Sequence, residues 1–159
     1  MNTIIVDGYN MLLRVPDLSR FLDVSLERGR DELLARIKNY LIRRKVSVIV
    51  VFDGGETHLP PAGNNFKRLT VLFSAYPKKA DPLIKDLIRR ADNKKGVILV
   101  SDDGELRRFA ADNGSGLLTT AEFHALLARP MQSQEIYNKF DRELTQEELD
   151  EWLRLFGEK

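Results

Sequence analysis

The sequence contains no cysteine, which excludes disulfide bonds, thiolate metal sites and a cysteine nucleophile together. Histidine is almost as scarce, with two residues in a chain of 159, so any metal site would have to rely mainly on oxygen ligands. No apolar run is long enough to span a bilayer, and no signal peptide is evident at the first residues. We therefore expect a cytoplasmic protein that does not contact a membrane.

A strong excess of one charge is also missing, because the formal net charge is only +1. The total charge therefore does not mark a nucleic-acid binder, although charged residues make up 31% of the chain and are unevenly placed. Hydrophobic residues make up 43%, which is enough for a core and argues against global disorder. The length fits one domain with a short appendage, and we expect a domain over residues 1–128 and a helical extension over 129–159.

Short apolar runs alternate with helical patterns along the first four fifths of the chain. Apolar runs predict strands at residues 4–6, 46–52, 69–73, 97–100 and 117–118. Helices are expected after Ser25, from Asp81 as N-cap with Pro82 at the first helical position, at about 105–113 and at 120–127, whereas residues 11–23 look irregular. The alternation predicts a three-layer α/β/α domain with a mostly parallel central sheet.

Carboxylates follow the strands of this predicted sheet. Asp7, Asp53 and Asp102 come directly after apolar runs, and Asp81 starts a helix that follows a strand. Parallel strands place all these positions at one edge, where the charges would oppose one another's ionisation. A bound hard cation resolves that conflict, and all-oxygen ligation favours Mg²⁺ or Mn²⁺. Such an ion can activate water and hold a phosphodiester oxygen.

Each acid also has a purely structural interpretation. The sole role of Asp81 could be to cap a helix, and the sole role of Asp53 and of Asp102 could be to form turns. Asp7 is harder to explain in that way, because a carboxylate at the end of a fully apolar strand is costly unless it is paired or liganded. Asn10 could ligate the ion, hold Asp7 through its amide or make a local turn bond. The joint arrangement of the acids is more informative than any single one.

Residues 4–11, with the sequence IIVDGYNM, resemble the opening of the YacP-type NYN domains, a branch of the PIN-like nucleases. Residues 50–53, 79–81 and 100–102 resemble later motifs of that family in order and spacing, and the resemblance covers about residues 1–127. It implies a PIN-like fold and metal-dependent endoribonuclease activity.

The resemblance also implies roles for individual residues. Metal-ligand roles fall on Asp7, Asp81 and Asp102, and Asn10 and Asp53 would support the site. Asp103 lies close enough along the chain to supply a further ligand, and so does Glu105.

Basic side chains must counter these acids if a phosphate backbone is to approach them. Contacts with the backbone give affinity without sequence preference and weaken with salt. Most of these charges could equally be solvated helix faces. Tyr9 and Tyr76 could stack on unpaired bases or simply pack. The candidates for RNA binding are Lys67, Arg68, Lys78, Lys79 and Arg107, with Arg28, Arg30 and Arg108 as further possible rim residues.

The leading hypothesis is a metal-dependent endoribonuclease acting on mRNA, tRNA or rRNA, either free or on the ribosome. One alternative is a non-catalytic RNA- or ribosome-associated binding module of the same fold. Another is a haloacid-dehalogenase-like phosphatase, but that class needs a second Asp where this chain has Tyr9. His58 has weak support as a catalytic residue, His124 is expected to be structural, and the oligomeric state stays open.

Overall fold

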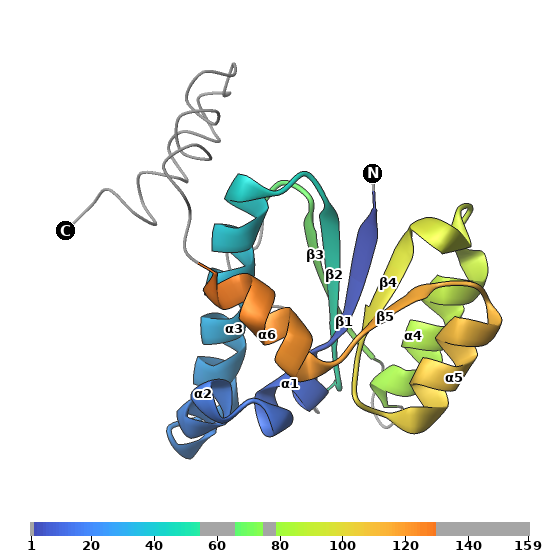
Figure 1. Ribbon diagram of the computed structural model, residues 1–159. Helices are drawn as coiled ribbons and strands as arrows, with labels where there is room; N and C mark the ends of the chain where they lie inside the picture. Colours follow the sequence, from blue (N-terminus) through green and yellow to red (C-terminus); the bar gives the residue numbers. More distant parts are fainter. Residues whose placement is uncertain (1, 55–65, 75–78, 130–159) are drawn as a thin grey trace, which may run out of the picture.

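The computed structural model describes residues 2–54, 66–74 and 79–129 (Figure 1). His58, Tyr76, Lys78 and the predicted C-terminal extension lie outside the described residues, apart from position 129. The elements in chain order are β1 (Thr3–Asp7), α1 (Gly8–Arg14), α2 (Pro16–Ser19), η1 (Arg20–Asp23), α3 (Leu26–Arg43), β2 (Ser47–Phe52), β3 (Leu69–Phe73), α4 (Ala80–Arg90), η2 (Lys94–Gly96), β4 (Val97–Val100), α5 (Gly104–Asp112), β5 (Gly116–Leu118) and α6 (Thr120–Ala128).

Five parallel strands form one sheet in the order β3-β2-β1-β4-β5. β1 is the central strand, and its last residue, Asp7, stands opposite Val51 of β2. Because every strand runs in the same direction, the segments that leave all five carboxyl ends meet at one edge. This arrangement confirms the predicted parallel α/β fold.

Helices cover both faces of the sheet, and each face has its own apolar core (Figure 1). Alternate residues of β1 divide between them: Ile4 and Val6 face α1, α3 and α6, whereas Ile5 faces α4 and α5. Helix α3 contributes Leu33 and Ile37, which are fully buried. Burial of one such side chain contributes about 1.5–3 kcal/mol. The sheet is therefore held between two packed layers of helices, and its carboxyl edge is fixed in position.

Residues 11–23, which the sequence pattern suggested to be irregular, are mostly helical, so that prediction was wrong. Met11, Leu12, Val15 and Leu18 follow a helical spacing and are all buried. Pro16 obscured the pattern because it ends one helix and stands at the first position of the next. The consequence for function is that α1 begins immediately after Asp7.

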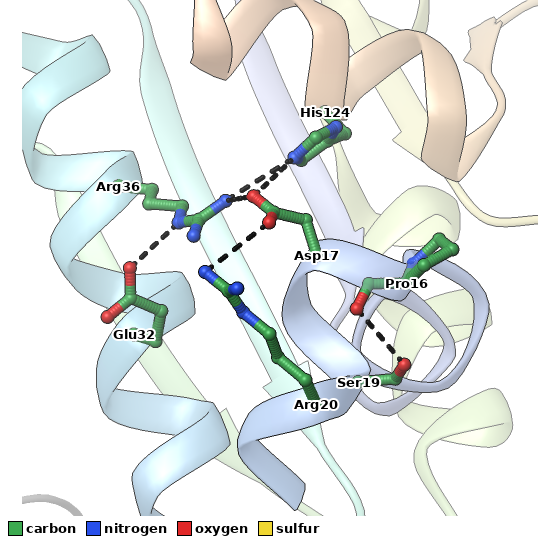
Figure 2. A network of polar contacts seen from close by, with 7 residues as sticks. All are labelled: Pro16, Asp17, Ser19, Arg20, Glu32, Arg36 and His124. Carbon is green, nitrogen blue, oxygen red and sulfur yellow. Dashed lines mark hydrogen bonds and ion pairs between the residues drawn. The ribbon is translucent and has the colours of Figure 1, made fainter.

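A polar network ties α2 to α3 and α6 (Figure 2). The Arg36 guanidinium donates to Asp17 over 2.7 Å and to Glu32 over 2.9 Å. His124 Nε2 lies 3.6 Å from the Asp17 carboxylate and 3.3 Å from Arg36. The hydrogen bonds and charge of Arg36 hold the pKa of Asp17 below its ordinary value. These contacts agree with the structural role expected for His124.

Candidate acidic active site

Asp7 ends the central strand and is only 7% exposed. The Ser101 hydroxyl, at the end of β4, donates a hydrogen bond of 2.9 Å to its Oδ2. Burial raises the pKa of Asp7 to about 6, and the charges of Asp81 and Asp53 add to the rise. The Ser101 hydroxyl and the nearby backbone amide of Asn10 oppose it. Asp7 is therefore a buried acid whose charge is only partly compensated.

Asn10 lies in the first turn of α1 and bonds to a different segment from those considered in the sequence analysis. Its Oδ1 accepts a hydrogen bond of 2.8 Å from the backbone N–H of Asp102. The start of α1 is therefore tied to the segment that leaves β4. This bond holds the start of α1, which directly follows Asp7, next to the segment that leaves β4.

Asp102 uses both carboxylate oxygens at the start of α6. Oδ1 accepts from the Thr120 backbone N–H over 2.9 Å, and Oδ2 accepts from the Thr120 hydroxyl over 2.7 Å. The side chain therefore fixes the first turn of α6. The ligand role implied for Asp102 stays a prediction, and it would have to use the remaining lone pairs of these oxygens.

Asp103, by contrast, interacts electrostatically with Asp81. Its Oδ1 accepts from the Leu106 backbone N–H over 3.0 Å and caps α5. Its charge is also the strongest of the charges that raise the pKa of Asp81. Asp103 thus combines a capping role with an electrostatic effect on Asp81.

Helix α4 begins at Ala80, with Lys79 at the N-cap position, so the prediction of Asp81 as N-cap was wrong. Asp53 satisfies this helix end from the neighbouring strand β2, because its Oδ1 accepts from the Ala80 backbone N–H over 2.7 Å. Asp81 sits in the first turn of α4. Within the described residues, no donor is hydrogen-bonded to its carboxylate. Helix capping, the structural role that the sequence analysis offered for Asp81, is performed by Asp53 instead.

The pKa of Asp81 is raised first by burial and then by the charges of Asp103, Asp53 and Glu105, while Lys85 opposes the rise. Together with the shift of Asp7, this shows that Asp81 interacts electrostatically with three other Asp side chains and that Asp7 also interacts with Asp53. The four side chains come from the ends of β1 and β2, the start of α4 and the N-cap of α5. The cluster consists of Asp7, Asp53, Asp81 and Asp103, and we call it the acidic cluster.

The acidic cluster suits a hard divalent cation by its chemistry, because it offers only oxygen donors whose negative charges oppose one another. In the part of the chain that the structure describes, however, no three acidic or histidine side chains form a ready-made metal-binding group. The Mg²⁺ or Mn²⁺ site therefore stays a prediction.

A groove of about 730 Å³ adjoins Asp81. It carries charges of both signs, since the Lys85 ammonium lies 2.7 Å from the Glu105 carboxylate. Asp7 is not among its lining residues, so the groove lies beside the acidic cluster and does not contain all of it. Its polar and aromatic lining includes Phe73, Ser74, Lys79, Asp81, Lys85, Arg89 and Glu105.

Comparison with known proteins identifies the family. Residues 4–155 match the family model described as the YacP-like NYN domain. The chain belongs to the YacP-like NYN family. A curated member, "Uncharacterized protein YacP" of Bacillus subtilis strain 168, is 31% identical over 93 residues, which is 58% of this chain and 55% of that protein. The aligned stretch thus spans about half the length of this relative.

Two crystal structures of Rae1 (YacP) from Bacillus subtilis share the NYN fold seen here. One has a TM-score of 0.67 at 21% identity and covers 97% of this chain and 83% of that chain. The other, a mutant form, has a TM-score of 0.66 at 22% identity and covers 98% and 92%. In this chain, no helix among the described residues is long and apolar enough to cross a membrane.

Several basic residues predicted to bind RNA have other positions or partners in this NYN fold. Lys67 and Arg68 precede β3 and therefore lie at the edge opposite the acidic cluster, which corrects the expectation that they flank it. Arg68 donates to three backbone carbonyls near the end of α3 and the start of β2. Arg107 likewise donates to the carbonyls of Ser101 and Leu118. Lys79 is exposed and lines the groove beside Asp81.

Ser101 is the residue of the site that the sequence analysis missed. Its hydroxyl donates to Asp7 and accepts from the Asp103 backbone N–H over 3.1 Å. The available signal was its place directly after β4, at the same edge as the acids. A search confined to carboxylates passes over such a residue, because its contribution is to orient the acid.

Proposed function

We propose that this protein is a metal-dependent endoribonuclease that hydrolyses RNA phosphodiester bonds at the acidic cluster, with Mg²⁺ or Mn²⁺ as cofactor. The observation that carries the proposal is the convergence of Asp7 and Asp81, from a strand end and a helix start, each with a raised pKa. Membership of the NYN family supports the same assignment. Two carboxylates that oppose one another's ionisation are both stabilised in the charged form when a cation lies between them.

Asp7, Asp81 and Asp103 would hold the metal, and Asp102 would contribute through lone pairs that Thr120 leaves available. When bound, the ion would supply an activated water and stabilise charge on the phosphate. Asp53 supports the site by fixing the start of α4, 2.7 Å from the Ala80 backbone N–H.

The remaining residues orient these acids. Ser101 holds Asp7 through its hydroxyl, which limits the directions that the buried carboxylate can take. Asn10 links α1 to the segment after β4. The bond therefore restrains the backbone that directly follows Asp7. Preorganised acids are important here, because displaced ligands lose both metal affinity and alignment with the substrate.

Cleavage of a mixed single-stranded RNA pool, with Mg²⁺, with Mn²⁺ and with EDTA, tests the proposal. The wild-type protein should cut internally with either metal and fail with EDTA. Asp81→Asn should abolish cleavage while the circular dichroism spectrum stays native. Asp112→Asn, which changes an exposed acid at the end of α5, is the matched control and should cut normally. Full activity of an Asp7→Asn, Asp81→Asn double variant would refute the assignment.

A second candidate is a non-catalytic RNA- or ribosome-associated module with the same fold. The observation in its favour is that no three-residue metal group is ready-made among residues 2–54, 66–74 and 79–129. Calorimetric titration with Mg²⁺ and Mn²⁺ separates the two candidates. The nuclease should bind the ions and lose them on Asp81→Asn, whereas RNA binding without ion binding or cleavage would support the module.

A further inference from the structure

Arg30, in the second turn of α3, has a buried donor without an acceptor. Its Nε is buried and makes no hydrogen bond, and no described residue accepts from its other nitrogens. The side chain is half-buried, and its guanidinium carbon lies over two aromatic rings, 5.9 Å from the centre of Phe52 and 5.6 Å from that of Phe73. Such a donor carries a desolvation penalty. The two Nη nitrogens are not among the buried atoms, so they are the groups of Arg30 that a ligand can reach.

Other half-buried arginines of the described part have clear partners. Arg36 pairs with two carboxylates. Arg68 and Arg107 donate to backbone carbonyls at the ends of elements, where they stabilise the fold. Within the described residues, Arg30 has neither a carboxylate nor a carbonyl partner. The described contacts of its charge are those with the two rings, so its Nη nitrogens are available to a ligand.

The position of Arg30 connects it to the acidic cluster. Phe52 and Phe73 are the last residues of β2 and β3, so their rings mark the carboxyl edge of the sheet. Gly8 directly follows Asp7, and a Cβ added to it would lie 2.5 Å from the Phe52 ring. The Phe52 ring therefore touches the backbone next to Asp7 and also lies under the Arg30 guanidinium.

A guanidinium in this position suits a phosphodiester. It is planar and permanently charged, and it can donate two parallel hydrogen bonds to phosphate oxygens. Cation–π contact with two rings restricts the movement of the guanidinium before a ligand arrives, which reduces the entropy lost on binding. The acidic cluster repels an RNA backbone, so a nearby cation is needed for the phosphates that the metal does not contact.

We propose that Arg30 binds a backbone phosphate of single-stranded RNA next to the bond that is cut, and so positions the strand at the acidic cluster. The proposal rests on the function proposed above and adds a residue on the α3 face, opposite the side of the sheet that carries α4 and α5. Arg30 is a positioning residue, because the geometry assigns it no contact with the reacting atoms.

The first test measures RNA binding without cleavage. Fluorescence anisotropy with a labelled single-stranded oligonucleotide in EDTA gives Kd over a range of salt concentrations. Arg30→Gln should weaken binding about tenfold. It should also reduce the slope of log K against log salt by about 0.7, the value for one phosphate contact on a single strand. Arg20→Gln is the matched control, because Arg20 also lies over a ring, that of Phe21, which is not a strand-end residue. It should change Kd less than about twofold.

Arg30→Lys separates charge from geometry. The ammonium keeps the positive charge and therefore the salt slope, but it lacks the planar pair of donors, so affinity should fall about threefold. In cleavage assays with Mg²⁺, KM should rise for both Arg30 variants while kcat stays near the wild-type value. Should Arg30→Gln fail to fold, as judged by circular dichroism, the KM of Arg30→Lys decides the question, and a wild-type KM would overturn the proposal.

The outcomes separate this proposal from the proposed function. Unchanged affinity and salt slope in folded Arg30→Gln would overturn the role of Arg30, even if the wild-type protein cleaves RNA. Weaker RNA binding by Arg30→Gln, in a protein that never cleaves RNA, would refute the nuclease assignment and retain Arg30 as a phosphate-binding residue. Absence of RNA binding by the wild-type protein would overturn both.

Discussion

The Ser101 hydroxyl donates a hydrogen bond of 2.9 Å to the Asp7 carboxylate, joining residues 94 positions apart in the chain. The same hydroxyl accepts from the Asp103 backbone N–H. One small side chain therefore links the buried acid of the central strand to the N-cap of α5. The orientation of two members of the acidic cluster depends on it, which makes Ser101 a sensitive point for substitution.

Ser101→Ala should raise the pKa of Asp7 further above its ordinary value, because the hydroxyl bond favours the ionised form. More of the Asp7 carboxyl is then protonated at pH 6 in Ser101→Ala than in wild type. Mg²⁺ should therefore bind the variant less tightly than wild type at pH 6, and this difference should shrink at pH 8. Calorimetric titrations at pH 6, 7 and 8 measure this. Ser19→Ala, which loses only a bond to the Pro16 carbonyl, is the control. Equal Mg²⁺ affinity in Ser101→Ala and wild type at pH 6 would contradict the expectation.

Asp7→Asn should stabilise the metal-free protein at high pH. The pKa of Asp7 in the folded protein, about 6, exceeds its ordinary value of 3.8, so folding favours the protonated form. That stability is fully present below about pH 3.8 and is lost as the pH rises through 6. At pH 8 the ionised acid destabilises the fold by up to about 3 kcal/mol. Asparagine avoids this loss and can still accept from Ser101.

Urea unfolding in EDTA at pH 5 and pH 8 measures this difference. The advantage of Asp7→Asn over wild type should be largest at pH 8 and about half as large at pH 5, which lies between the two pKa values. Asp112→Asn, at an exposed position, should show little change at either pH. A constant difference between Asp7→Asn and wild type across this range would mean that the substitution acts through packing.

Metal ions should stabilise the wild-type protein. Binding to the folded state alone adds about 2.7 kcal/mol at an ion concentration of 100 times Kd. Melting curves with increasing Mg²⁺ or Mn²⁺ should therefore shift upward, and EDTA should reverse the shift. Asp81→Asn should remove most of it, because this carboxylate is not hydrogen-bonded within the described residues and is available to a ligand. An identical shift in Asp81→Asn would exclude Asp81 as a ligand.

Two substitutions of Asp53 distinguish its structural role at the start of α4 from a role in metal binding. Asp53→Ala removes the acceptor of the Ala80 backbone N–H and should cost about 0.5–2 kcal/mol of stability. Asp53→Asn keeps an acceptor oxygen and should retain most of that stability. If Asp53 acts only by fixing α4, Asp53→Asn should also retain cleavage. Loss of cleavage in a stable Asp53→Asn would instead assign its charge to the metal site.

Gly8→Ala should destabilise the protein by about 1–3 kcal/mol, the cost of overpacking. The added Cβ would lie 2.5 Å from the Phe52 ring, which is buried and cannot move freely. Displacement of this ring should also disturb Arg30, so RNA affinity should fall with stability. Thermal melts and anisotropy on the same sample test both effects. A neutral substitution would show that the Phe52 ring can shift without cost.

The sequence by itself determined the strands and the edge at which the acids lie. Buried parallel strands appear as short, continuous apolar runs, and Asp7, Asp53 and Ser101 directly follow three of them. The opening motif also indicated the family, which the comparison confirmed. These inferences succeeded because strand periodicity and the position of a residue after a strand are local properties of the chain.

Only the tertiary structure decided what each side chain contacts. Sequence order cannot reveal that Asp102 bonds to Thr120 while the charge of Asp103 raises the pKa of Asp81, because both follow the same strand. It also cannot reveal that Asp53 satisfies the start of α4. These contacts join segments 18 or more residues apart, and they depend on how the layers pack around the sheet edge. The chemistry of the site therefore lies in long-range hydrogen bonds that exist only after the helices have packed.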